Sequence, residues 1–126
     1  MLVYRFMRKP SMDPAVLAKE LESDEEANAP CDSRERRYPE LREARSVFEP
    51  EGAALRRWRT MLHGAEQRGE ELAYKFIAQL RIGADEGFCV ERRGKQGHVL
   101  LWGDKTKLAA AVIRVFAGSD EANEED

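Results

Sequence analysis

Two short apolar runs and the polar stretch between them constrain the fold of this chain most. Residues 88–90 and 99–102 are apolar, and residues 91–98 between them are polar and contain two glycines. Two strand-like runs joined by a glycine-containing polar stretch are the pattern of a β-hairpin. Asp104, directly after the second run, is a residue type that caps helices. The sequence therefore predicts a hairpin over residues 88–102, followed by a helix.

That last helix is expected to run to Gly118, because glycine commonly follows a helix C-terminus. Its inward-facing residues are expected to be Leu108, Val112, Val115 and Phe116. Between residues 53 and 82, large apolar residues are spaced by three, four and seven positions, as on one face of a helix. This face includes Leu55, Trp58, Leu62, Ala65, Leu72, Phe76 and Leu80. Gly64 and Gly69 interrupt this pattern, and glycine is unfavourable inside a helix. The segment could therefore form one helix or two, and we favour two.

The first half of the chain has weaker patterns. Residues 2–7 are rich in strand formers and predict a short strand. Ser11 or Asp13 can cap a short helix with Pro14 in its first turn, and Leu17 and Leu21 give this helix a narrow apolar stripe. Residues 22–37 contain no large apolar side chain, which is typical of a linker or a surface loop. Residues 38–48 predict another short helix that ends before Pro50.

Together these elements predict an α+β fold. The sheet is expected to be small and antiparallel, built from the hairpin at 88–102 with residues 2–7 as a candidate third strand. Two to four helices are expected, with the central and last helices covering one face of the sheet. The length of 126 residues and the apolar fraction of 42% are typical of one domain, which we place at residues 1–118 with a mobile charged loop at about 22–37.

Charge is unevenly distributed along the chain. Residues 1–52 carry nine Lys and Arg against twelve Asp and Glu, whereas residues 53–118 carry twelve against seven. Residues 119–126 carry five acids and no base, and they have no apolar side chain larger than alanine. Such a segment cannot repay the entropy of ordering, so we expect a disordered acidic tail that improves solubility. The alternative role for this tail is competition with an anionic ligand for the basic block.

Several features indicate a cytoplasmic protein. No apolar run approaches the roughly 18 residues that a membrane helix needs, and the first nine residues do not resemble a secretory signal. The chain has two cysteines, Cys31 and Cys89. We expect two free thiols, because the compartment is reducing and the apolar run around Cys89 predicts its burial. No membrane contact is expected.

Catalytic motifs are scarce, so we expect a protein that is not an enzyme and that uses no metal or cofactor. His63 and His98 have no second ligand at metal spacing, and the glycines match no nucleotide-binding motif. A remote alternative is a metal-dependent nuclease. Its two acidic residues would be Asp85 and Glu91, and its basic residue would be either Arg93 or Lys95.

Basic residues provide the candidate binding sites. One group lies at the hairpin tip and the start of the last helix, where free main-chain amides also favour an anion: Arg92, Arg93, Lys95, Lys105 and Lys107. A second group, Arg56, Arg57 and Arg59, surrounds Trp58 on a predicted helix. Trp58 itself falls on the apolar face and is expected to be buried. Either basic group could contact the phosphates of a nucleic acid.

The overall charge favours a different partner. The sequence pI is near 5.5, whereas a dedicated nucleic-acid-binding domain is expected to be basic. Small size, a mixed-charge surface and the lack of a catalytic motif are typical of a regulatory protein. We therefore expect a non-enzymatic binding protein that acts through a protein partner, with nucleic-acid binding as the alternative.

Overall fold

A single antiparallel sheet organises the chain. The computed structural model describes residues 1–83 and 87–120, and in these residues six strands form one sheet in the order β4-β5-β2-β1-β3-β6. The strands are β1 (Leu2–Met7), β2 (Arg45–Phe48), β3 (Phe76–Arg81), β4 (Cys89–Arg93), β5 (His98–Trp102) and β6 (Val112–Ala117). The helices are α1 (Pro14–Glu20), α2 (Ser33–Arg37), α3 (Glu51–Gln67) and α4 (Lys105–Ala111), with a 3-10 helix, η1 (Pro39–Glu43). The predicted α+β class is confirmed, and the sheet is larger than expected.

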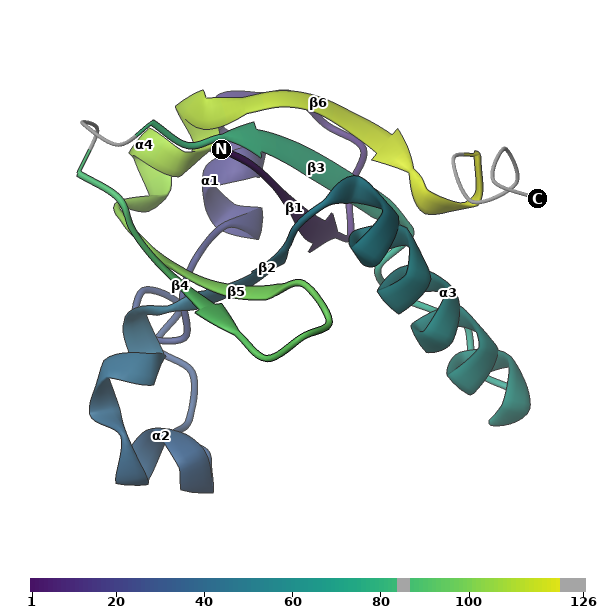
Figure 1. The fold of residues 1–126 in the computed structure, drawn as a ribbon, viewed down its shortest axis with the longest axis horizontal. Coiled ribbons are helices and arrows are strands. Elements are labelled where there is room, and N and C mark those ends of the chain that lie inside the picture. The colour runs from purple at the N-terminus through teal and green to yellow at the C-terminus, as the bar shows by residue number, and fades with distance from the viewer. Residues whose placement is uncertain (84–86, 121–126) are drawn as a thin grey trace.

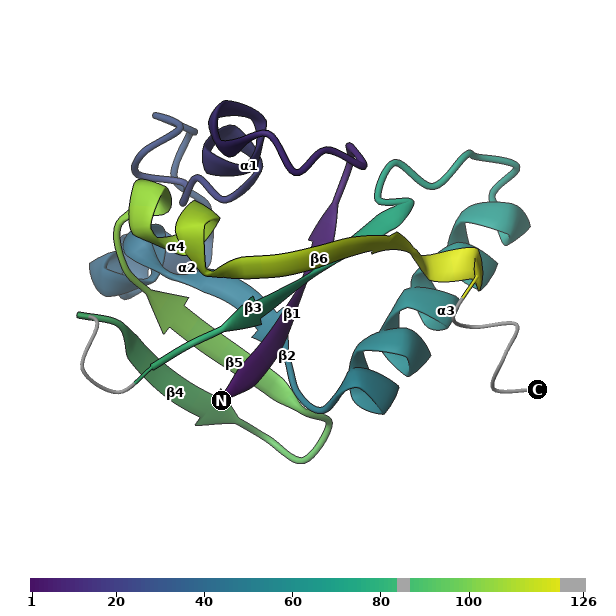
Figure 2. The ribbon, with the colours of Figure 1, turned by 90° about the horizontal axis from the view of Figure 1, so that it is seen from above.

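Helices cover both faces of the sheet rather than one. α1 and α4 lie together on one face, and α3 lies apart from them (Figures 1 and 2). One core forms under α1 and α4 and includes Leu17, Leu108 and Val47, whereas a second core forms under α3 and includes Leu55 and Trp58. The predicted burial of Trp58 is confirmed, and its Nε1 donates to the carbonyl oxygen of Tyr74 at 2.8 Å.

The segment that contains β3 was predicted to be helical, and that prediction is wrong after residue 67. α3 is a single helix that passes through Gly64 and ends at Gln67. β3 then pairs with β1 from Phe76 to Arg81. Ile77 faces the core under α3, while Leu80 faces the opposite core. A strand covered on both faces lacks a clear polar alternation, so its apolar residues also fit a helical spacing.

The last predicted helix is also divided. Asp104 caps α4 as expected, with its Oδ2 accepting from the main-chain nitrogen of Thr106 at 3.0 Å. α4 ends at Ala111, and Val112–Ala117 form β6 against β3. Leu108 is buried in the helix as predicted, but Val112, with Val115 and Phe116, lies on this strand. The run is rich in β-branched residues, which favour a strand once a partner is available.

Residues 38–48 do not form the predicted helix. Pro39–Glu43 form η1, and Arg45–Phe48 form β2, which pairs with β5. The predicted linker at 22–37 includes α2, although its mobility stays a prediction. α2 begins with a capping box, in which the main-chain nitrogen of Glu35 donates to Asp32 Oδ1 at 2.7 Å and that of Asp32 donates to Glu35 Oε1 at 3.1 Å.

The remaining local predictions are confirmed except one. β1 forms over residues 2–7, the hairpin comprises β4 and β5, and Asp13 caps α1. Cys31 and Cys89 are free thiols, but Cys89 is exposed because β4 is the edge strand.

No helix in residues 1–83 or 87–120 is long and apolar enough to span a membrane. Six of the eight tail residues, 121–126, lie outside the described part of the chain.

Candidate functional site

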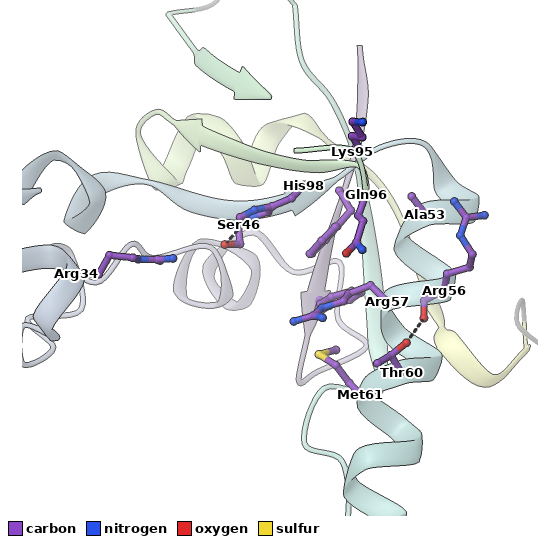
Figure 3. Close-up of a pocket in the computed structure, with 12 residues that line it drawn as sticks. Arg34, Ser46, Ala53, Arg56, Arg57, Thr60, Met61, Lys95, Gln96 and His98 are labelled. Carbon is purple, nitrogen blue, oxygen red and sulfur yellow. Dashed lines mark hydrogen bonds between the residues drawn. The ribbon is translucent and has the colours of Figure 1, made fainter. Parts of the chain in front are cut away.

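The residues that the structure describes form a groove on the α3 side of the sheet. It has a volume of about 870 Å³, within the range of ligand-binding pockets, and Figure 3 shows the residues around it. Its floor is formed by β1, β2 and β5, and α3 forms one wall. Arg34, from α2, approaches from the opposite side, and the β4–β5 turn contributes Lys95 and Gln96.

Three aromatic rings line the floor of the groove in a row. Phe6, Phe48 and His98 belong to β1, β2 and β5, which are adjacent in the sheet. The ring centroids of Phe6 and Phe48 are 5.2 Å apart, and those of Phe48 and His98 are 5.3 Å apart. Because side chains alternate along a strand, the sheet places all three rings on the face that α3 leaves partly open.

The walls of the groove are basic. Its charged lining residues are Arg34, Arg56, Arg57 and Lys95, and no carboxylate lines it in the described part of the chain. None of these four cations forms an ion pair with a carboxylate of residues 1–83 or 87–120. Figure 3 shows Arg34 and Arg57 pointing toward each other across the groove. Two guanidinium groups that face one space favour an anion there.

The position of Arg34 depends on ionic contacts of its own segment. Arg45, at the start of β2, is buried, donates to the carbonyl oxygen of Leu21 and pairs with Glu26. Arg42 Nε lies 2.7 Å from Glu25 Oε2. These contacts attach the segment before α2 to the sheet, so that a stretch of sequence without a large apolar residue still has a defined place.

Ser46 and His98 form a polar pair between the two guanidinium groups. Ser46 Oγ lies 3.0 Å from His98 Nε2, and the Ser46 hydroxyl is exposed to the groove. Partial burial lowers the pKa of the His98 imidazole, and the positive charges of Arg34, Arg57 and Arg93 lower this pKa further. Neutral His98 can therefore donate to or accept from a ligand at neutral pH.

This pair also has the spacing of a serine nucleophile and its base. Such a base is normally oriented by a third group on its other ring nitrogen. Within the described residues, the only hydrogen-bond partner of the His98 ring is Ser46. The arrangement therefore has the chemistry of a polar ligand contact, and the expectation of a non-enzymatic protein stays a prediction.

Arg5 links the two strands beneath the groove where they diverge. β1 pairs with β3 along six residues but with β2 only between Tyr4 and Phe48. Arg5 Nη1 donates to the carbonyl oxygen of Ser46 at 3.0 Å. Its buried Nε has no hydrogen-bond partner in the described part of the chain, and burial lowers the pKa of this guanidinium.

The first predicted basic group is not brought together. The hairpin tip and the start of α4 lie at opposite ends of β5 (Figure 2). Arg92 pairs with Glu49, and Arg93 Nη2 lies 3.1 Å from Glu91 Oε2. At the other end, Lys105 Nζ lies 3.4 Å from Glu22 Oε2, and Lys107 lines a separate hollow beside Phe88. Lys95 is the member of this group that reaches the groove.

The second predicted basic group contributes two residues to the groove. Arg56 and Arg57 line it, whereas Arg59 is half-buried elsewhere on α3. The residues that the sequence did not indicate are Arg34, Ser46, Phe6, Phe48 and His98. Residues 45–48 offer no sequence signal for Ser46 and Phe48, because the strand buries the polar Arg45 and its polar and apolar residues do not alternate.

The acidic residues of the nuclease alternative do not form a described site. Asp85 lies outside the described residues, and Glu91 is paired with Arg93. Among the residues that the structure covers, no group of three or more Asp, Glu, His or Cys side chains could hold a metal ion. The nuclease alternative therefore has no geometric support from Glu91, Arg93 and Lys95.

The fold and the groove define an α+β protein with a basic groove whose floor is aromatic. Comparison of the chain with protein-family models, with curated proteins and with solved structures finds no match.

Proposed function

We propose that this protein binds nucleic acid in the groove between α3 and the strands β2 and β5. The observation that carries this proposal is the charge of the lining, which is cationic at Arg34, Arg56, Arg57 and Lys95 and unopposed by any described carboxylate. Phosphates are the ligands that such unpaired cations bind best, and this contact supplies most of the affinity for nucleic acids. The net charge of −3 does not exclude this proposal, because no carboxylate of the described residues lines the groove.

This proposal favours the alternative that the sequence left open over a protein partner. The exposed large apolar residues of the described chain are scattered over several elements, from Leu2 to Ile113, and they do not support a single docking patch. It also moves the interface away from Arg92, Arg93 and Lys105, which are paired with carboxylates, and keeps Lys95 of the five predicted cations.

The test compares two double variants with the same change in charge. Arg34→Ala/Arg57→Ala removes the facing cations of the groove, whereas Arg92→Ala/Arg93→Ala removes two that are paired with Glu49 and Glu91. Fluorescence anisotropy with labelled single-stranded and duplex DNA and RNA at two salt concentrations measures affinity. We expect the groove variant to bind about tenfold more weakly at low salt and to reduce the salt slope by roughly two, one per phosphate contact.

Arg92→Ala/Arg93→Ala measures how much affinity is lost when two positive charges are removed outside the groove. Equal losses in both double variants would assign the binding to overall charge and remove the groove from the proposal. Absence of measurable binding by the unmodified protein at low salt would end the nucleic-acid proposal and leave the protein partner as the hypothesis to test.

A further inference from the structure

We infer that the groove binds unpaired nucleotides of a single strand, with a base against the stacked rings of Phe48 and His98 and the adjoining phosphate between Arg34 and Arg57. This inference rests on the proposed function and specifies its ligand. The carrying observation is that one groove is lined both by an aromatic row and by facing cations, because a nucleotide presents a flat ring and an anionic phosphate close together.

The aromatic row provides the base contact. Phe6, Phe48 and His98 lie across three adjacent strands with centroid spacings of 5.2 and 5.3 Å. The Phe48 and His98 rings are stacked, with 29° between their planes, and the Phe6 ring is tilted by 31° to that of Phe48. Phe48, at the centre, is half-buried and lines the groove. Aromatic side chains on an open sheet face are platforms on which unpaired bases stack. Each such contact typically changes affinity by about tenfold.

The phosphate contact lies next to this platform. Arg34 and Arg57 approach from α2 and α3, and Ser46 and His98 lie between them (Figure 3). The guanidinium groups can each bind a phosphate through two parallel hydrogen bonds. Ser46 Oγ supplies a further hydrogen bond. Gln96, which Figure 3 shows pointing into the groove, offers an amide to the edge of a base.

A duplex does not present what this surface recognises. In a duplex the bases are paired and stacked on each other, so their ring faces are unavailable to Phe48 and His98. The stacking contact therefore selects for single strands, whereas the cations alone would accept either form. This difference separates the base contact from general attraction to phosphate.

The experiment uses three labelled probes of equal length: a deoxythymidine decamer, a strand of the same phosphates without bases, and a duplex. Anisotropy titrations are made with the unmodified protein and with Phe48→Leu, which keeps an apolar side chain but removes the ring. Phe116→Leu is the matched control, because Phe116 packs in the same core cluster but does not line the groove. Thermal unfolding checks that both variants fold.

The expected result is a difference of about tenfold that depends on bases. The unmodified protein should bind the decamer about tenfold more tightly than either the abasic strand or the duplex. Phe48→Leu should lower affinity for the decamer to that level and leave the abasic strand unchanged, and Phe116→Leu should change neither.

Two results would overturn the inference while the proposed function stands. The first is equal binding of the decamer and the abasic strand by the unmodified protein, which needs no variant and shows that only phosphates are recognised. The second is competition by thymidine monophosphate at the same concentration as by the unlabelled decamer, which would assign the groove to free nucleotides. Failure to bind any strand would instead end both the inference and the proposed function.

Discussion

At the scale of single residues, the pKa of His98 reflects its partial burial and the positive charge of the groove. Its imidazole is partly buried and lies near Arg34, Arg57 and Arg93, which come from α2, α3 and β4. Both conditions disfavour the charged form, so the pKa is lowered in the folded protein relative to its ordinary value. The same residue in an unfolded chain has neither condition. Folding and protonation of His98 therefore oppose each other.

The stability of the protein should consequently depend on pH through His98. A lowered pKa in the folded protein means that the unfolded chain binds more protons. The contribution of His98 to the free energy of unfolding is therefore present above the ordinary histidine pKa, which is about 6.5. It is lost as the pH falls through the folded pKa. Urea unfolding at pH 7.5 and at pH 5.5 should show a smaller loss of stability in His98→Gln than in the unmodified protein. His63→Gln, at an exposed position on α3, is the control. Identical pH dependence in His98→Gln and the unmodified protein would contradict this reading of the groove.

At the scale of elements, the hairpin is held against the start of α3 by its turn. The main-chain nitrogen of Glu49 donates to the carbonyl oxygen of Gly97 at 2.9 Å. Gly97 has a φ of 81°, and a Cβ added there would lie 2.2 Å from the Glu49 carbonyl oxygen and 2.8 Å from Ala53 Cβ. Only glycine permits both this backbone conformation and this close approach. This turn also places Lys95 and Gln96 over the groove.

Substitution at the two turn glycines should separate strain from close contact. Gly94 also has a positive φ, 68°, but an added Cβ would meet nothing within 4 Å. We expect Gly94→Ala to cost about 1 kcal/mol from backbone strain alone. Gly97→Ala should cost more, because it adds a clash with the main chain of Glu49. Chemical denaturation of both variants measures the difference in free energy of unfolding. Equal costs would show that the hairpin does not pack against α3 as described.

At the scale of the whole molecule, charge is segregated so that a chain with a net charge of −3 has a basic groove. Several acids in the first half of the chain pair with cations that do not line the groove. Glu25, Glu26 and Glu22 pair with Arg42, Arg45 and Lys105, respectively. The segment at 119–126 adds five acids and no base. Local fields, rather than the pI, therefore decide what this surface attracts.

Removal of residues 119–126 should leave the fold intact and strengthen binding. The segment has no apolar surface to bury, and its deletion removes five negative charges. At low ionic strength we expect an increase in affinity for a single strand of roughly severalfold, which disappears at high salt because charges are then screened. Anisotropy titrations and thermal unfolding of the truncated protein provide the measurement. A fall in melting temperature of several degrees would show instead that this segment packs against the domain.

The sequence by itself determined the features that depend on neighbouring residues. The hairpin, the strand at 2–7 and the caps at Asp13 and Asp104 each rest on contacts within a few positions, so their residue types were sufficient. The two arginines of α3 that line the groove, Arg56 and Arg57, were likewise recognisable from the helical pattern around Trp58.

Only the tertiary structure decided the rest. Residues 76–81 and 112–117 became strands because each found a partner strand far along the chain, and pairing energy outweighed a helical spacing of apolar residues. The groove was assembled in the same way, since Arg34, Ser46, Arg57 and His98 come from four separate elements. No local pattern places such residues together, because the distances between them are set by the order of the strands and by the packing of α3 on the sheet.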